Sequence, residues 1–435
     1  MTARLRKLLN QLGDTFWLIP GAMVLAAVLM AYLLLEIDRS HMLPAWLTDE
    51  WLYNGGGTGA RTLLGAIASS AIGVAGTVFS ITIAALTLAA GQMGPRLLQN
   101  FTRDRGNQVT LGVFLATFAY ALLVLRSVRT QNEGSFTPHL ALSVGVLLAF
   151  VCVATLVYFV DHMANRINVD TVVDLVSNDV RAAMAGLTSD KPPAAPPPAA
   201  FWQHAVAITD PRSGYLQQLD ANGLADWAAE HGTVIRLLVR RGDYVFPGAP
   251  VAVMSVAVEG ADAAIRNATA LNATRGSAGD AEHAVRQLVE VAVRALSPGT
   301  NDPNTAISVL DRLGAMLCGL AGLHLPGGVL LRNERPALLI PSTSYRIYIN
   351  LMFNMIRQYG ASSPAVLIRL LQVLTAVASC EPDADRRREL RRHAELVWSD
   401  AQREVANPAD LADIGKRRAS FLRMIDGDFI GVLRH

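Results

Sequence analysis

The sequence has 435 residues, of which 51% are hydrophobic and 17% charged, against about 25% charged in an ordinary soluble domain. This composition excludes intrinsic disorder for most of the chain, and a net charge of +2 excludes the basic excess of a nucleic-acid-binding protein. The charges are unevenly spread, since residues 1–160 hold 10 of the 38 basic and 7 of the 36 acidic side chains. The first third of the chain and the remainder are therefore suited to different solvents.

Four long runs without any charged residue lie in the first third of the chain. About 20 apolar residues are enough to cross the hydrocarbon core of a bilayer as a helix. We therefore expect a transmembrane domain over residues 1–160, embedded in the lipid bilayer. Its four spans are predicted at about 16–36, 62–90, 108–127 and 140–160. The first run is too long for a signal peptide and lacks a small-residue cleavage site, so it is interpreted as an uncleaved anchor.

The distribution of lysine and arginine near the spans indicates the orientation, because the excess marks the cytoplasmic side. With both termini inside, the cytoplasmic face carries seven such residues and the outer loops carry four. We therefore predict a multi-pass protein of a bacterial inner (plasma) membrane with both termini cytoplasmic. The residues after position 160 would then lie in the cytoplasm.

The second span differs from the others because small and hydroxyl residues follow one face of the predicted helix. They recur at intervals of three or four, which places them on a single stripe, and the pore-lining candidates among them are Ser69, Gly73, Gly76, Ser80 and Thr87. Such a stripe serves either close helix packing or the lining of a hydrated path. One stripe among four helices cannot enclose a pore, so conduction would need a homo-oligomer. The spans carry no Asp, Glu, Lys, Arg or His in their cores, which disfavours coupled transport.

A loop after the second span carries further candidates at the expected cytoplasmic surface, namely Gln92, Pro95, Arg96, Arg103 and Asp104. The run 78–125, with Phe79-Ser80, Gln92-Met93, Pro95-Arg96-Leu97-Leu98, Arg103-Asp104 and Leu111-Gly112-Val113-Phe114, resembles the bacterial family of predicted membrane proteins called domain of unknown function 2254. Residues 295–306 and 213–216, with Gly242, Asp243 and Gly248, are similar to the same family. The resemblance implies four membrane helices and a cytoplasmic region, but no activity and no catalytic residues.

The remaining chain predicts a cytoplasmic α+β region, which makes the fold class an α-helical integral membrane protein with such a region attached. Helical periodicity over 161–187 indicates a stalk, and five prolines make 188–200 a stiff linker. Short apolar runs over 201–258 predict a small β-sandwich-like module. Residues 259–435 are predicted to be mostly helical, with helices at 260–296, 342–359, 364–380, 383–405 and 408–424 and a hairpin at 328–340.

The loop before position 303 is a ligand-binding candidate through Ser297, Gly299, Asn301, Asp302 and Thr305. Asp302 followed by Pro303 is typical of a helix start, with the carboxylate as N-cap and the proline in the first helical position. The structural interpretation is a tight loop and a cap. The functional alternative is an anion at this helix start, or a cation held by Asn301 and Asp302.

Cofactor and catalytic motifs are not found in the sequence. Residues 241–250 resemble the Gly-Asp-x-Val-x-x-Gly corner of lipoyl and biotin carriers, but positions 192–415 contain no lysine that could carry the group. Three scattered cysteines form neither a disulfide framework nor a metal site. Because the nucleophile elbow, the P-loop and the zinc-protease motif are also missing, we expect no cofactor, no metal and no enzymatic activity.

Two functions remain open on these observations. The first is an oligomeric pore or channel-like protein for uncoupled passage of ions or small solutes, with the second span lining the path. The alternative is a membrane-anchored sensor or scaffold whose cytoplasmic part binds a ligand or a protein partner, without transport.

Overall fold

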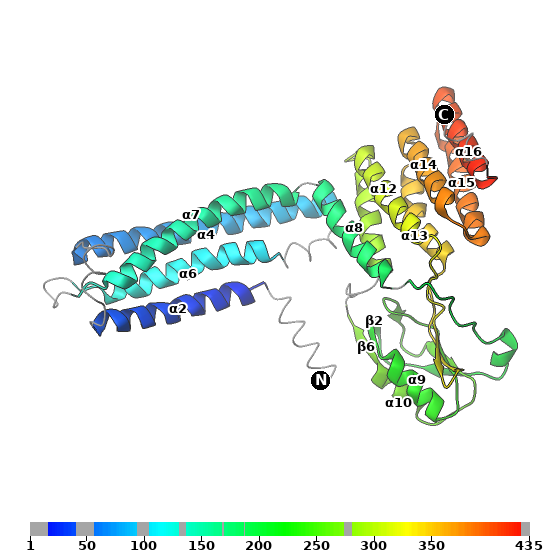
Figure 1. The fold of residues 1–435 in the computed structure, drawn as a ribbon, viewed down its shortest axis with the longest axis horizontal. Coiled ribbons are helices and arrows are strands. Elements are labelled where there is room, and N and C mark those ends of the chain that lie inside the picture. Colours follow the sequence, from blue (N-terminus) through cyan, green and yellow to red (C-terminus); the bar gives the residue numbers. More distant parts are fainter. Residues whose placement is uncertain are drawn as a thin grey trace. The chain divides into compact units, whose positions relative to one another are not determined.

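The computed structural model describes residues 16–40, 56–93, 104–129, 136–167, 169–186, 188–273 and 281–427. The chain divides into two compact units, Met1–Thr171 and Val172–His435. Helices dominate both units, and strands occur in short sheets of the second unit (Figure 1).

Among its described residues, the first unit contains four helices long and apolar enough to cross a membrane: α2 (Leu18–Arg39), α4 (Gly57–Met93), α6 (Arg105–Ser127) and α7 (His139–Ile167). The four predicted spans are confirmed as helices, although α4 and α7 extend beyond the predicted ends. Half of the most apolar window of α6 is buried, against 22% for each of the other three. Helix α6 is therefore the central helix, and it packs against α2, α4 and α7.

Acidic side chains fix the starts of two of these helices. Asp104 accepts a hydrogen bond from the Gly106 amide at 2.8 Å and caps α6, which explains why α6 begins before the predicted position 108. Asp38, at the end of α2, accepts from the amides of Leu140 and Ala141 at 3.1 and 3.0 Å and satisfies the first turn of α7. Both carboxylates lie at helix ends, outside the apolar cores.

The second unit holds two sheets joined by helices. The five-stranded sheet has the order β1-β5-β3-β8-β7, and the three-stranded sheet has the order β4-β2-β6. The strands are β1 (Val206–Thr209), β2 (Gly214–Leu219), β3 (Ile235–Leu237), β4 (Tyr244–Val245), β5 (Pro250–Met254), β6 (Thr269–Asn272), β7 (Val329–Arg332) and β8 (Arg335–Leu339). Neighbouring strands are antiparallel except for β3 and β8, which are parallel.

This sheet differs from the predicted β module, which ended at residue 258. Strands β7 and β8 come from far along the chain, and β8 pairs with β3 through Ile235 and Leu338. Their hairpin was predicted and is confirmed, with Asn333 and Glu334 at positive φ as a two-residue turn requires. The run 260–296 was expected to be helical, but β6 interrupts it because its backbone pairs with β2.

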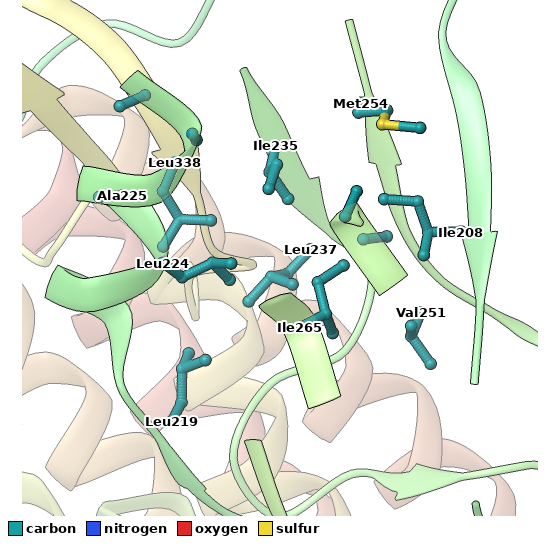
Figure 2. Packing of buried hydrophobic residues seen from close by; sticks show 14 of the residues in the cluster. Ile208, Leu219, Leu224, Ala225, Ile235, Leu237, Val251, Met254, Ile265 and Leu338 are labelled. Atoms are coloured by element: carbon teal, nitrogen blue, oxygen red, sulfur yellow. The ribbon is translucent and has the colours of Figure 1, made fainter. Parts of the chain in front are cut away.

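The core of the β region lies between the five-stranded sheet and two short helices, α9 (Ala221–Glu230) and α10 (Ala261–Ala268). Figure 2 shows the apolar side chains of both helices directed at those of the strands. Leu224, Ile235, Leu237 and Leu338 are each at most 1% exposed. Because burial contributes about 25 cal/mol for each Å² of apolar surface, the packing of these side chains stabilises the region.

The helical part of the second unit comprises α8 (Val169–Ala185) and six later helices. These are α11 (Ala281–Ala295), α12 (Pro303–Gly319), α13 (Tyr345–Tyr359), α14 (Pro364–Cys380), α15 (Ala384–Glu404) and α16 (Pro408–Ile425). A short 3-10 helix, η3 (Ala199–Trp202), ends the proline-rich segment. The predicted starts near 364, 384 and 408 are confirmed, since Pro364 and Pro408 occupy first-turn positions and Asp383 caps α15.

Candidate functional site

One face of α4 is exposed in the described part of the chain, and it carries the predicted polar stripe together with apolar residues such as Ile72, Phe79 and Ile83. Ser69, Gly73, Gly76, Ser80 and Thr87 are all exposed, whereas Ala71, Ala75, Val78 and Ala85 on the other side of the helix are at most 5% exposed. A Cβ added at Gly73 or Gly76 would meet no atom within 4 Å. The stripe therefore does not serve helix packing among the described residues of the chain.

The hydroxyl groups of the stripe are bonded within their own helix. Ser69, Ser80 and Thr87 donate to backbone carbonyls four residues earlier, at 2.8, 2.9 and 2.9 Å. These bonds satisfy the hydroxyl protons, which lowers the cost of placing the stripe in an apolar medium. The oxygen lone pairs remain, so the hydroxyls of the face present acceptors rather than donors.

The loop candidates after α4 are described only in part. Pro95, Arg96 and Arg103 lie outside the described residues, and the side chain of Gln92 is not described either. Asp104 is described, and its carboxylate lies 2.8 Å from Nε2 of His162 on α7. Gly106 makes this approach possible, because a Cβ there would lie 2.6 Å from the same nitrogen. The sequence analysis did not single out His162, which lies 58 residues away from Asp104.

Polar side chains continue from this pair along the buried side of α6. Asn107 is 2% exposed and Thr110 is fully buried, and the side-chain polar atoms of both have no hydrogen-bond partner in the part of the chain that the structure describes. Further along, the Cys152 thiol donates to the Thr117 hydroxyl at 3.3 Å. A pocket of about 200 Å³ between α4, α6 and α7 is lined by Ser70, Thr117 and Cys152 and by seven apolar residues. Its wall is therefore mostly apolar.

The predicted ligand loop before α12 uses its polar groups internally. Asp302 accepts from the amides of Asn304 and Thr305 at 3.0 and 3.2 Å and from the Thr305 hydroxyl at 2.6 Å. These bonds lower the pKa of Asp302, with the Thr305 hydroxyl as the largest cause. Ser297 donates to the Arg294 carbonyl at 2.6 Å, and Gly299 and Asn301 are exposed. The structural interpretation, a tight loop and an N-cap, is confirmed.

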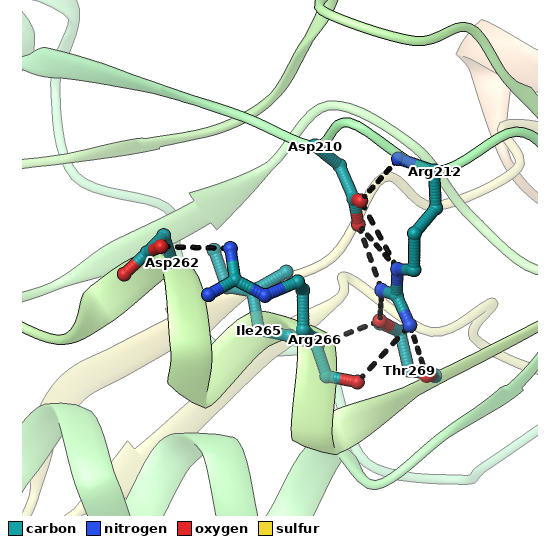
Figure 3. Close-up of polar contacts among 6 residues, drawn as sticks. All are labelled: Asp210, Arg212, Asp262, Ile265, Arg266 and Thr269. Carbon is teal, nitrogen blue, oxygen red and sulfur yellow. Dashed lines mark hydrogen bonds and ion pairs between the residues drawn. The ribbon is translucent and has the colours of Figure 1, made fainter.

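An ion pair between the buried Asp210 and the partly exposed Arg212 in the β region was not foreseen (Figure 3). Nη2 of Arg212 lies 2.7 Å from the Asp210 carboxylate and 2.7 Å from the Thr269 hydroxyl, and Nη1 donates to the Thr269 carbonyl. Burial raises the pKa of Asp210, but the hydrogen bonds and charge of Arg212 outweigh it, so the pKa is lowered overall. The pair joins β6 to the loop between β1 and β2.

A pocket of about 500 Å³ lies beside this ion pair, between the edge strand β1 and the start of α10. Thr209, Asp262 and Arg266 form part of its lining, together with apolar residues of β1 and β5. Nη1 of Arg266 lies 2.7 Å from Asp262, so the charges at the rim are balanced. The pocket suits a small, largely neutral ligand better than an anion.

Helices α13 and α15 enclose a polar layer. Arg357 and Asp400 form a buried ion pair, and His393 is fully buried beside it, with no hydrogen-bond partner for either ring nitrogen among the described residues. Burial, reinforced by the positive charges of Arg357 and Arg392, lowers the pKa of His393 to about 3. This histidine is therefore neutral at physiological pH. Among the described residues, no group of three or more His, Cys, Asp or Glu side chains could hold a metal ion.

Comparison with known proteins agrees with this architecture. An uncharacterized protein of Mycobacterium tuberculosis strain H37Rv and one of Mycobacterium bovis are each 34% identical to the chain over 442 residues, covering 95% of the chain and 81% of the relative. No solved structure matches the chain significantly. The model of a family described as predicted membrane protein matches residues 13–376. The chain therefore belongs to this family of predicted membrane proteins, domain of unknown function 2254.

Proposed function

We propose that the protein is a multi-pass inner-membrane protein that assembles into a homo-oligomer and conducts ions or small solutes without coupling. The observation that carries the proposal is the position of the α4 stripe, whose small and hydroxyl residues face away from α2, α6 and α7. The same side of α4 also exposes Ile72, Phe79 and Ile83, at 40%, 42% and 47%, so this surface combines small, hydroxyl and apolar side chains on which another helix can pack. We expect several copies of the chain to pack against one another through this face of α4, with the conduction path along the axis between the copies.

The chemistry of the face favours particular solutes. Its hydroxyl protons are bonded to the α4 backbone, so the face offers lone pairs to whatever passes. Lone pairs partly replace the water shell of a cation or accept a hydrogen bond from a neutral solute. Anions gain nothing from such a surface, so we expect a preference for cations or small neutral donors.

The orientation of the assembly follows from the charge distribution. With both termini in the cytoplasm, the lysine and arginine excess lies on the cytoplasmic side. The second unit would then lie in the cytoplasm, where it assembles the ring or regulates the path. We propose no catalytic role, no cofactor and no nucleic-acid partner.

Cysteine substitution in a background without native cysteines tests both parts of the proposal. Gly76→Cys places a thiol on the α4 face, and Val157→Cys, 69% exposed on α7, is the matched control. Gly145 of α7 contacts Leu64 of α4, which places these two residues at the same level of the two helices. Position 76 lies twelve residues after Leu64 and position 157 lies twelve residues after Gly145, so the two introduced thiols have a similar depth in the membrane. We expect oxidation to cross-link chains through position 76 but not through position 157.

Conduction is measured on purified protein in planar bilayers. We expect currents that a charged, thiol-specific reagent blocks in Gly76→Cys and leaves unchanged in Val157→Cys. Cross-linking without any current in several salts and voltages would support assembly and refute conduction. Failure of both would refute the proposal as a whole.

The pocket beside β1 favours a second candidate, a membrane-anchored sensor or scaffold that does not transport. Its volume of about 500 Å³ suits a small molecule. Thermal-shift screening of neutral metabolites against the full chain and an Ala207→Trp variant, in which an exposed residue of the pocket lining is enlarged, tests this function. Stabilisation of the native protein that the variant loses would support it, and a shift that is equal in both would refute it.

A further inference from the structure

Two cysteines distant in sequence meet at the ends of two packed helices of the second unit. Cys318 lies in the last turn of α12 and is partly buried, whereas Cys380 is the last residue of α14 and is exposed. Both are free thiols. The Cys380 thiol is directed at the backbone carbonyls of Ala376 and Val377, at 3.6 and 3.3 Å, and lies near enough to Cys318 to affect the pKa of its thiol.

Contacts along both helices place Cys318 level with the last turn of α14, which ends at Cys380. Nε of Arg369 on α14 lies 2.5 Å from the Asp311 carboxylate on α12, and one turn later Gly314 admits the side chain of Val373. Asp311, Gly314 and Cys318 follow one another on one side of α12. The two helices therefore run in the same direction and bring their C-terminal ends side by side.

Arg386 holds the two helix ends in this position. Its guanidinium donates to the carbonyls of Leu320 and Leu323 after α12, at 3.1 and 2.6 Å, and to the buried Glu381 carboxylate next to Cys380, at 3.4 Å. It also lies 4.9 Å above the ring of Tyr345. The Arg386 side chain thus connects the segment that follows Cys318 with the residue that follows Cys380.

The two thiols differ in their environments. Burial, together with the hydrogen bond and charge of Cys380, raises the pKa of Cys318 to about 12. Cys318 therefore remains a protonated thiol at neutral pH, sheltered from solvent. Cys380 is exposed and is the sulfur that a dissolved reagent reaches first.

We propose that Cys318 and Cys380 form a peroxide-oxidisable pair that closes to an intrachain disulfide. The Cys380 thiolate attacks a hydroperoxide oxygen, so that an S–O bond forms, the O–O bond breaks, and the leaving alcohol or water takes up a proton. Cys318 then attacks the sulfenic sulfur of Cys380. The S–S bond forms as the S–O bond breaks, and the released hydroxide takes the Cys318 proton to leave as water. The peroxide is reduced by two electrons, and a dithiol reductant reverses the reaction.

Closure would join the C-terminal ends of α12 and α14 and would enclose β7, β8 and α13 in a covalent loop. Such a loop restricts the unfolded chain and raises the stability of the folded state. The loop includes β8, a strand of the five-stranded sheet, but both sulfurs lie on helices. Oxidation would therefore fix α12 against α14 within the helical part.

The experiment uses the full chain in detergent or nanodiscs, treated with hydrogen peroxide or diamide and then denatured for thiol counting. We expect two of the three thiols to disappear, a peptide joining positions 318 and 380, and a higher unfolding temperature that dithiothreitol reverses. C152S should behave like the native chain. C318S should accumulate a sulfenic acid at Cys380 that dimedone traps, and C380S should leave Cys318 unmodified.

Two results would overturn the proposal. One is a native chain that keeps Cys318 and Cys380 free under diamide while an exposed reference thiol in the same sample is oxidised. The other is a product whose only link joins Cys380 residues of two chains. Both results come from the native protein, so they stand even if a serine variant fails to fold.

Discussion

The buried His393 makes the stability of the second unit depend on pH in a defined window. Its pKa is lowered to about 3 in the folded chain, against about 6.5 for an ordinary histidine. Between these pH values the unfolded chain binds a proton at His393 and the folded chain does not. The contribution of His393 to the free energy of unfolding is therefore fully present above pH 6.5 and is lost as the pH falls. Relative to pH 7.5, we expect a loss of about 1 kcal/mol at pH 5.5 and about 3 kcal/mol at pH 4.5 from this group.

Two substitutions isolate this contribution from that of the other titrating groups. His393→Leu and His393→Gln both remove the ionisable ring, and they differ in polarity. At pH 7.5 we expect His393→Leu to be within about 1 kcal/mol of the native chain, because it also removes two unbonded buried nitrogens. Below pH 6.5 both variants should lose less stability than the native chain.

Chemical unfolding of the full chain, followed by tryptophan fluorescence at a series of pH values, measures the difference between native and variant. That difference should change with pH by the amounts above and in the same way for both variants. Parallel curves for the native and variant chains over pH 7.5–4.5 would refute the reasoning, because His393 would then titrate in the folded state as it does in the unfolded one.

Three further predictions concern close contacts and a cap. Gly314→Ala would place a Cβ 2.5 Å from Val373, so it should cost about 1–3 kcal/mol in chemical unfolding, and Val373→Ala in the same chain should recover part of the loss; strictly additive costs would contradict this. Asp302→Ala should cost about 1 kcal/mol at neutral pH, and because the pKa of Asp302 is lowered, this cost should vanish as the pH falls through its folded pKa; a pH-independent cost would exclude the cap as its cause. Gly106→Ala should displace the His162 ring from Asp104 and lower the melting temperature in detergent, whereas an unchanged melting temperature would show that the two helices adjust freely.

Local chemistry explains which elements were predictable from sequence. The four apolar helices and α14 follow from charge-free runs and from a proline at a helix start, both of which are visible in a short window. Strand β6 was missed because its conformation depends on pairing with β2, some 55 residues earlier, rather than on its own residues. The β region was predicted to end too early because β8 pairs with a strand a hundred residues away.

The candidate sites divide in the same way. The small-residue stripe of α4 was visible in the sequence, but the choice between inward and outward facing depends on which side of α4 the other helices occupy. His162 and the pair of Cys318 and Cys380 were not foreseen, because each depends on contacts between distant helices. Periodicity in the sequence shows which residues share one face of a helix, whereas tertiary packing determines what that face contacts.

The parallel pairing of β3 with β8 affects the order in which the protein can fold during synthesis. When β3 leaves the ribosome, its neighbour β5 follows within twenty residues, but β8 is made only after α11 and α12. One edge of β3 therefore stays open while about a hundred residues are translated. A nascent chain stalled before residue 335 should bind a chaperone that recognises unpaired strands, and one stalled well beyond residue 340 should not.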